Sequence, residues 1–220
     1  HKLLIESQKL GSYLALRLTG NAPIGVYMEK GIDTIIAYFG IVYAGRCYAP
    51  VDATNPKERT QRVLGHLSPE AIVTSESLRE EMAYFVEKGI VRENDIIFLS
   101  DAREIKPDEE KLAVIRRDMI ATDPLYIIFT SGSSGFPKGV ITSHESLMNY
   151  IMAYAQMMEI QTDERIANQS PLDYIAAIRD IYLPIYKGCY TYLTEKKDFS
   201  QPAKLFWLLN QKRITCAGWS

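Results

Sequence analysis

The chain has 220 residues, which is enough for one large domain or two small ones. Hydrophobic residues make up 47% and charged residues 24%, and the formal net charge of −2 excludes a bulk attraction to nucleic acid or anionic membranes. No apolar run is long enough to span a bilayer, and the first residues do not resemble a signal peptide. The three cysteines, Cys47, Cys189 and Cys216, are too few and too scattered for a disulfide framework or a cysteine-based zinc site. We therefore expect a cytoplasmic protein with no nucleic-acid or membrane partner.

Apolar segments of strand and helix character alternate along the first hundred residues. The expected strands cover 22–28, 47–52, 71–75 and 95–100, and the expected helices cover 31–45, 55–67 and 77–89. Asn55 is expected to cap the second helix, with Pro56 at its first position. Residues 101–122 are charged and weakly periodic, so they are the candidate for a surface connection and a subdomain boundary.

The same alternation continues in the second half. A strand over 124–130 is followed by a loop of small residues, and a helix is expected to begin near Ser143. Further helices are expected near 177–187 and 202–211, and further strands near 189–193 and 214–218. This alternation predicts an α/β fold of layered, mostly parallel sheets flanked by helices. Because no helix follows the last strand, we expect the chain to be part of a larger fold.

The loop within YIIFTSGSSGFPKGV, residues 126–140, has a composition suited to anions. It contains Thr130, Ser131, Gly132, Ser133, Ser134, Gly135 and Lys138. Such a loop leaves the carboxyl end of a strand, where ligands bind in open α/β sheets. Its glycines let N–H groups approach a ligand, its hydroxyl groups add donors, and its lysine adds a positive charge. We therefore predict a pyrophosphate- or triphosphate-binding turn between a buried strand and a helix, with a flexible surface turn as the alternative.

The stretch YIIFTSGSSGFPKGVITSHESL closely resembles the phosphate-binding motif of the adenylate-forming superfamily. This superfamily includes acyl-CoA synthetases, luciferases and the adenylation domains of nonribosomal peptide synthetases. The stretch GIVYAGRCYAPVDATNPKERTQRVL, residues 40–64, is similar to the version found in amino-acid adenylation domains. The resemblance covers nearly the whole chain. It implies that residues 1–220 are a partial N-terminal adenylation (AMP-binding) domain, with the C-terminal domain absent.

The resemblance implies a ligase that activates a carboxylic acid with ATP as an acyl-adenylate. The acyl group would then move to the thiol of CoA or of a carrier-protein phosphopantetheine, which makes a carrier protein a candidate partner. Thr130 to Gly135 and Lys138 would hold the β- and γ-phosphates, Lys138 in a catalytic role, and Mg²⁺ would offset further charge. Because other family motifs lie beyond Ser220, we expect the chain alone to be inactive. The alternatives are a non-catalytic nucleotide- or phosphate-binding module and an unrelated phosphotransferase.

The acyl pocket of the amino-acid adenylation domains that the chain resembles includes a segment reading FDASVWEIF. A gapless alignment places YIAAIRDIY, residues 174–182, on this segment. Tyr174 then takes the aromatic position, and Ile175 stands where an Asp holds the substrate ammonium group. Asp173, two residues earlier, either pairs with an ammonium group or caps the following helix. We favour the cap, and with it an acid that lacks an α-ammonium group, because the alignment then needs no backbone rearrangement.

Two further sets of residues have structural roles in our interpretation. His144 matches the histidine that follows the family's phosphate motif, and we expect a structural histidine there. His66 is expected at the surface. Met152, Met157 and Met158 fall on a helix and are expected in its core-facing row.

Overall fold

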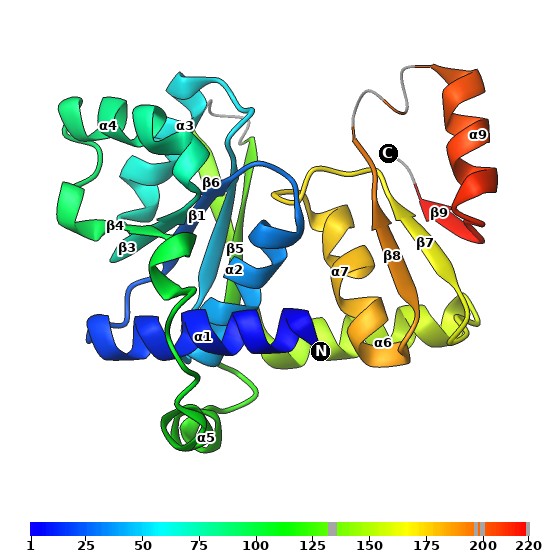
Figure 1. Ribbon diagram of the computed structural model, residues 1–220, viewed down its shortest axis with the longest axis horizontal. Coiled ribbons are helices and arrows are strands. Elements are labelled where there is room, and N and C mark those ends of the chain that lie inside the picture. The colour runs from blue at the N-terminus through cyan, green and yellow to red at the C-terminus, as the bar shows by residue number, and fades with distance from the viewer. Residues whose placement is uncertain (132–135, 196–197, 199–200, 219–220) are drawn as a thin grey trace. The chain divides into compact units, whose positions relative to one another are not determined.

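The computed structural model describes residues 1–131, 136–195, 198 and 201–218, with Ser131 described by its backbone (Figure 1). The chain divides into two units, His1–His144 and Glu145–Ser220. The segment 101–122, our candidate for a boundary, therefore lies inside the first unit. No helix within the described ranges is both long and apolar enough to cross a bilayer.

A six-stranded sheet forms the centre of the first unit, in the order β4-β3-β1-β2-β5-β6. Its strands are β1 (Ile24–Met28), β2 (Tyr48–Asp52), β3 (Ala71–Thr74), β4 (Ile96–Phe98), β5 (Pro124–Ser131) and β6 (Pro137–Ser143). The strands from β1 to β5 pair in parallel, whereas β6 pairs antiparallel with β5. All residues of β1 are buried, as expected for a central parallel strand that is covered on both faces. The predicted α/β layering is confirmed.

Helices cover both faces of this sheet. They are α1 (Lys2–Arg17), α2 (Ile32–Tyr43), α3 (Lys57–Leu67) and α4 (Arg79–Glu87). On one face, Leu64 of α3 and Phe85 of α4 join a buried apolar cluster with Tyr27 of β1. On the other face, Tyr38 of α2 stacks on Tyr48 of β2 with 4.4 Å between ring centroids, and α1 packs outside α2.

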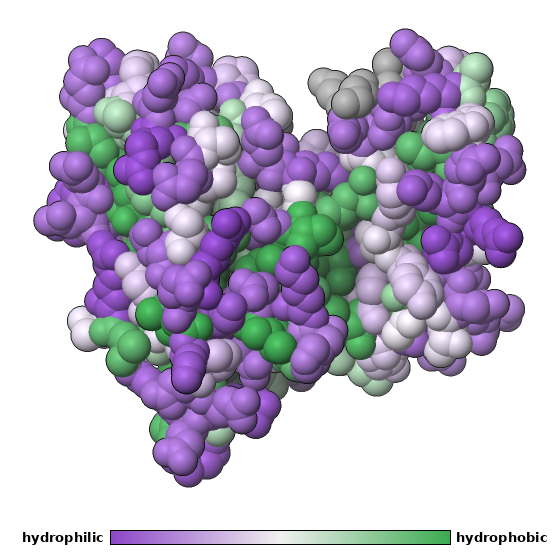
Figure 2. Space-filling model, viewed as in Figure 1, coloured by the Kyte–Doolittle hydropathy of each residue, from purple (hydrophilic) through white to green (hydrophobic). Residues whose placement is uncertain are grey.

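The charged segment 101–122, our candidate for a surface connection, contains a helix that we did not predict, α5 (Glu109–Asp118). Asp108 caps it, because its Oδ1 accepts a hydrogen bond of 2.9 Å from the Lys111 backbone N–H. Leu112 is its one buried residue. Figure 2 shows mainly hydrophilic residues over α5, at the lower edge of the view. This helix was not predicted because its apolar periodicity is weak, and the periodicity is weak because the buried face of the helix is small.

Two further features of the first unit differ from the sequence analysis. The helix α1 was not predicted. The helix α3 begins at Lys57 with Pro56 as its N-cap residue and without a side-chain cap, so the assignment of Asn55 as the cap is wrong. The Asn55 N–H donates to the Asp52 carbonyl at 3.1 Å, which makes Asn55 part of the turn after β2.

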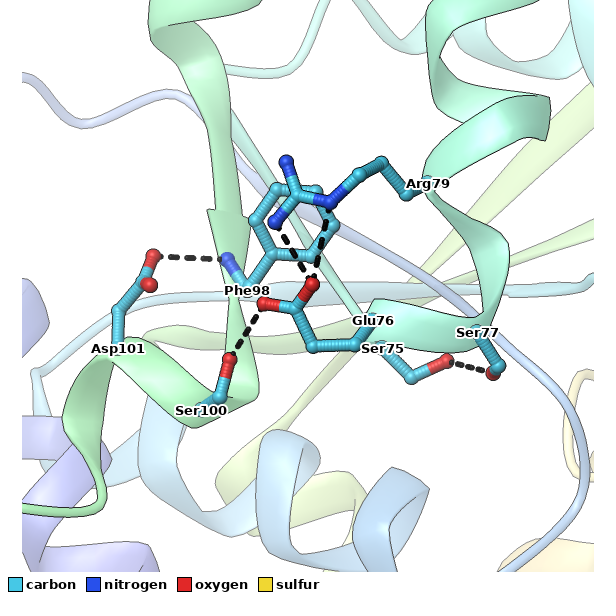
Figure 3. Close-up of polar contacts among 7 residues, drawn as sticks. All are labelled: Ser75, Glu76, Ser77, Arg79, Phe98, Ser100 and Asp101. Atoms are coloured by element: carbon cyan, nitrogen blue, oxygen red, sulfur yellow. Dashed lines mark hydrogen bonds and ion pairs between the residues drawn. The ribbon is translucent and has the colours of Figure 1, made fainter.

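A polar network joins the turns that follow β3 and β4 (Figure 3). The Glu76 carboxylate accepts hydrogen bonds from Ser100 Oγ at 2.7 Å and from Arg79 Nη2 at 2.7 Å. The Arg79 guanidinium also lies 4.0 Å from the centroid of the Phe98 ring. The hydrogen bond from Ser100, followed by the one from Arg79, lowers the pKa of Glu76. Three short 3₁₀ helices, Glu76–Leu78, Glu93–Asp95 and Leu99–Ala102, shape this edge.

The second unit is built on a three-stranded parallel sheet in the order β8-β7-β9. The strands are β7 (Arg165–Asn168), β8 (Tyr190–Leu193) and β9 (Cys216–Gly218). The helices are α6 (His144–Met157), α7 (Ile175–Lys187) and α9 (Pro202–Gln211). β7 was not predicted, whereas α7, β8 and α9 lie close to their predicted positions.

The methionines of the second unit do not lie where we expected them. The buried row of α6 consists of Leu147, Ile151 and Ala155, which follow one another at a spacing of four. Residues 152, 157 and 158 lie off this row. Their side chains are 48%, 70% and 48% exposed, so the prediction that these methionines are in the core is wrong.

Candidate functional site

The strands β5 and β6 form an antiparallel hairpin that presents two of the predicted phosphate ligands. Thr130 pairs directly with Lys138, and Ser131 pairs with Pro137. Thr130 and Lys138 are both exposed, and the Thr130 hydroxyl lies 3.5 Å from the Lys138 carbonyl oxygen. Residues that pair directly across a hairpin project their side chains to the same face. The Thr130 hydroxyl and the Lys138 ammonium group therefore project to one side at the end of the hairpin.

The predicted turn differs from the structure in one respect. We expected the motif to lead from a strand into a helix, but β6 intervenes and Lys138 belongs to that strand. Pro137 and Gly139 disfavour strand structure in the sequence, although an edge strand tolerates both. Gly132, Ser133, Ser134 and Gly135 lie outside the described residues, and their predicted role stays a prediction.

The hairpin is anchored by close packing beneath Gly139. A Cβ atom at this position would lie 2.8 Å from Ile127 Cγ2 and 3.3 Å from Phe129 Cζ. Phe129 is buried in the apolar cluster of the first unit, and its ring lies edge-on to that of exposed His66. Because side chains alternate along a strand, Thr130 projects away from this cluster. The packing thus fixes the backbone that carries Thr130 and Lys138.

Thr130 lies at the carboxyl edge of the parallel sheet. The register pairs Tyr48 of β2 with Tyr126 of β5, so Asp52 and Thr130 each follow four residues beyond this pair. The Asp52 carboxylate accepts hydrogen bonds from the backbone N–H and the hydroxyl of Thr54, at 2.8 and 2.7 Å. Ligands of open α/β sheets bind at this edge.

His144 lies at the opposite end of the hairpin from Lys138. Its backbone N–H donates to the Asp123 carbonyl at 3.2 Å, and it follows Lys138 by six residue steps along the strand, which corresponds to about 20 Å. Its Nε2 is buried without a hydrogen-bond partner in the described part of the chain. Burial lowers the pKa of His144 and outweighs the opposing effect of the Asp123 carboxylate. The distance from Lys138 supports the predicted structural role.

His144 also borders a mainly apolar cavity of about 410 Å³ in the first unit. The cavity is lined by Phe39, Val42, Tyr43, Arg116, Met119, Ile120, Ala121 and His144. It lies at the end of α2 and the start of β5, away from the carboxyl edge where the phosphate motif begins.

The second unit contains a buried ion pair in the middle of an otherwise apolar helix. Asp180 of α7 is fully buried, and its Oδ1 accepts a hydrogen bond of 2.8 Å from Arg179 Nε. Its Oδ2 accepts a second hydrogen bond, of 2.9 Å, from Asn168 Nδ2 at the end of β7. Burial alone would lower the pKa of Arg179, but its hydrogen bond to Asp180 and the charge of Asp180 raise it. Arg179 therefore stays protonated inside the unit.

Sequence analysis did not single out this pair. The sequence did contain a signal, which is the adjacent Arg and Asp within the apolar stretch IAAIRDIYLPIY. Two opposite charges in an apolar helical pattern indicate a buried ion pair, because each buried charge requires a partner.

The predicted pocket residues lie at the amino end of α7. Tyr174 is the N-cap residue of this helix and Ile175 its first residue, and their side chains are 49% and 50% exposed. The N-cap position of α7 is therefore occupied by Tyr174 and not by Asp173. This end of α7 follows β7, so residues 173–175 lie at the carboxyl edge of the second sheet. Their role in substrate binding stays a prediction.

The three cysteines take no part in either site. None of them forms a disulfide. Burial raises the pKa of the Cys47 thiol to about 12, and it also raises the pKa of Cys189 and Cys216. These thiols are therefore protonated at neutral pH, which argues against a role as nucleophiles.

Comparison with known proteins identifies the family. The family model described as AMP-binding enzyme matches residues 1–218. The chain belongs to the AMP-binding enzyme family. It is 26% identical to gramicidin S synthase 1 of Brevibacillus brevis over 98% of its length, and 32% identical to the D-alanine–D-alanyl carrier protein ligase of Listeria welshimeri over 83%. It spans 19% and 35% of these two relatives.

The fold comparison agrees with this family. A crystal structure of a four-domain nonribosomal peptide synthetase bound to AMP and glycine matches 98% of the chain with a TM-score of 0.79 and 21% identity. The chain covers 15% of that structure. At this identity the match shows that the chain shares the fold of adenylate-forming domains.

Proposed function

We propose that this chain supplies the phosphate-binding hairpin and part of the acid-binding site of an adenylate-forming ligase. The observation that carries the proposal is the pairing of Thr130 with Lys138 at the carboxyl edge of the sheet, in a chain of the AMP-binding enzyme family. The ligase would join a carboxylic acid to the α-phosphate of ATP and release pyrophosphate. A cytoplasmic location is our expectation for such an enzyme.

The chemical difficulty of this reaction is that both reactants are anions. The acid's carboxylate must approach the α-phosphorus while negative charge moves onto the departing pyrophosphate. Lys138 would hold the β- and γ-phosphates through its ammonium group, and the Thr130 hydroxyl would donate a hydrogen bond to the same phosphates. The packing beneath Gly139 fixes the backbone between them, so both donors are in place before the reaction.

Mg²⁺ would bind with ATP and offset further phosphate charge. Within the described ranges no three His, Cys, Asp or Glu side chains are grouped so that they could hold a metal ion.

The acyl group would then pass from the adenylate to a thiol. The name of the Listeria welshimeri relative includes a carrier protein. By analogy we propose the phosphopantetheine thiol of a carrier protein as the acceptor, with CoA as the other candidate. Attack of the thiol on the acyl carbon forms the thioester and releases AMP.

The test is the carboxylate-dependent exchange of labelled pyrophosphate into ATP, catalysed by the gene-encoded full-length protein. The proposal predicts exchange that requires an acid. A binding module would retain ATP or pyrophosphate without exchange, and an unrelated phosphotransferase would phosphorylate an acceptor and release ADP. We expect the 220-residue chain alone to show no exchange, and exchange at the full-length rate would contradict that expectation.

A further inference from the structure

The cavity beside His144 has the size and the apolar walls of a binding site for a small molecule. Its volume of about 410 Å³ falls within the range of about 300–1,000 Å³ that is common for ligand pockets. Thr130 and Lys138 of the phosphate hairpin are not among the described residues that line it, so this cavity is separate from the site proposed above. The apolar walls come from α2 and from the segment after α5, and they consist of Phe39, Val42, Tyr43, Met119, Ile120 and Ala121.

Hydrogen bonds to Asp123 hold these walls in position. The Asp123 carboxylate accepts a hydrogen bond of 2.9 Å from the Ile120 N–H, and the Asp123 N–H donates to the Ile120 carbonyl at 3.0 Å. The Asp123 carbonyl accepts from the His144 N–H at 3.2 Å. The turn that carries Ile120 and the histidine that follows β6 are thus joined to the same residue. A ligand would therefore meet a formed pocket and would not have to order a loop, which favours binding.

His144 brings to this cavity a polar atom that lacks a partner. The residue lines the cavity, and its Nε2 is buried without a hydrogen-bond partner in the part of the chain that the structure describes. A buried polar atom of this kind is costly to leave unpaired and needs an explanation in a folded protein. Because burial lowers the pKa of His144, its imidazole is neutral at neutral pH and carries one N–H. An oxygen atom of a ligand would supply the partner for this group.

The charge of the lining favours an anionic ligand. Among the described residues that line the cavity, Arg116 carries the one formal charge and none is acidic. Arg116 is exposed, so its guanidinium can pair with the charged end of a ligand while that end stays in contact with water. A cationic ligand would face Arg116, and an uncharged one would leave its charge unused. A carboxylate has two oxygens and can accept from Arg116 and His144 together.

We propose that this cavity binds a small amphipathic monocarboxylic acid, whose carboxylate accepts hydrogen bonds from His144 and Arg116 and whose apolar chain packs against α2. At about 30 Å³ for each water-sized group, the volume of about 410 Å³ holds about 14 such groups, so octanoate fits inside it. The inference goes beyond the proposed function, because this acid binds apart from the acid that the ligase would activate.

The experiment measures the binding of octanoate to the full-length protein by calorimetry without ATP. Octanol and octylammonium carry the same chain with an uncharged or a cationic end, and acetate carries the carboxylate without the chain. We expect octanoate to bind about 10-fold or more tightly than each of the other three. Octanoate can also enter the acid site of the ligase, so variants of the cavity must show where it binds.

Three variants change the cavity and one serves as the matched control. Ala121→Phe places a ring in the cavity from an exposed position and should weaken octanoate binding about 10-fold or more. Arg116→Gln removes the charge and should weaken it about 5-fold or more, and His144→Phe keeps a ring without nitrogen and should weaken it about 3-fold or more. The control is Arg117→Gln, at the exposed neighbouring position of α5, which should bind octanoate as the wild type does. Melting temperatures by circular dichroism establish that each variant is folded.

The outcomes decide the inference separately from the proposed function. If octanoate does not bind, or if octanol or octylammonium binds as tightly, the inference is wrong. It is also wrong if either folded Ala121→Phe or folded Arg116→Gln binds octanoate as tightly as the wild type, because octanoate then occupies another site. The binding assay contains no ATP, so a failure of pyrophosphate exchange with every acid would contradict the proposed function and leave this inference intact.

Discussion

Substitution of Asp180 by Ala should strongly destabilise the second unit. The carboxylate is fully buried and accepts hydrogen bonds from Arg179 and Asn168, at 2.8 and 2.9 Å. Its removal leaves an uncompensated guanidinium charge and an amide donor inside the unit. Breaking a buried ion pair by removing one partner costs about 3–5 kcal/mol in the free energy of unfolding. With a urea dependence of about 1–3 kcal/mol per molar, the unfolding midpoint should fall by about 1 M or more.

The assay is urea unfolding followed by tryptophan fluorescence, because Trp207 and Trp219, the two tryptophans of the chain, both follow residue 144. The double variant Arg179→Met/Asp180→Leu removes both charges and should cost only about 1–3 kcal/mol, for the amide donor left unpaired. Exposed Asp163→Ala is the matched control and should change the midpoint little. The reasoning is refuted if Asp180→Ala costs less than 1 kcal/mol, or if the double variant is as unstable as the single one.

Three smaller effects should also be measurable. Because burial lowers the pKa of His144, the folded state binds fewer protons than the unfolded state, and stability should fall as the pH drops below about 6.5. Thermal melts of the His144→Gln variant should show a smaller loss of stability over this pH range. The same pH dependence in the variant and the wild type would argue against this role of His144. Gly139→Val should cost about 1–3 kcal/mol in chemical denaturation, because Cβ alone would meet Ile127 at 2.8 Å, and unchanged stability would contradict the packing. Ser100→Ala should raise the pKa of Glu76 toward its ordinary value in an NMR titration, whereas an unmoved pKa would assign the shift to another cause.

Most of the first sheet could be predicted from the sequence, because its parallel strands are continuous apolar runs. APIGVYM and AIVTS are examples, and each is bounded by charged or turn-forming residues. The strand β6 escaped prediction because Pro137 and Gly139 oppose strand propensity. What favours it is tertiary, namely pairing with β5 and the packing of Phe129 over Gly139. Neither contact can be predicted from the strand propensities of the residues in β6.

The candidate sites were predicted unevenly for a similar reason. The motif around Lys138 is contiguous, so its composition and its family resemblance are visible in one stretch of sequence. The cluster around Arg179 is assembled from three elements, with Asn168 on β7, Arg179 and Asp180 on α7, and Gly218 on β9. Neighbouring charges in a helix usually mean a solvated face, and only the fold shows that this pair is buried.

The most direct test of the proposed function is acid-dependent pyrophosphate–ATP exchange by the full-length protein and by its Lys138→Ala variant. The exposed Lys138 side chain does little packing, so the variant should melt at the wild-type temperature. A charge-assisted hydrogen bond contributes about 1.5–3 kcal/mol, so exchange should fall roughly 10- to 150-fold. Lys106→Ala, at another exposed position of the first unit, should exchange at the wild-type rate. Equal exchange by the wild type and Lys138→Ala, or no exchange with any acid by the wild type, would contradict the function proposed for this chain.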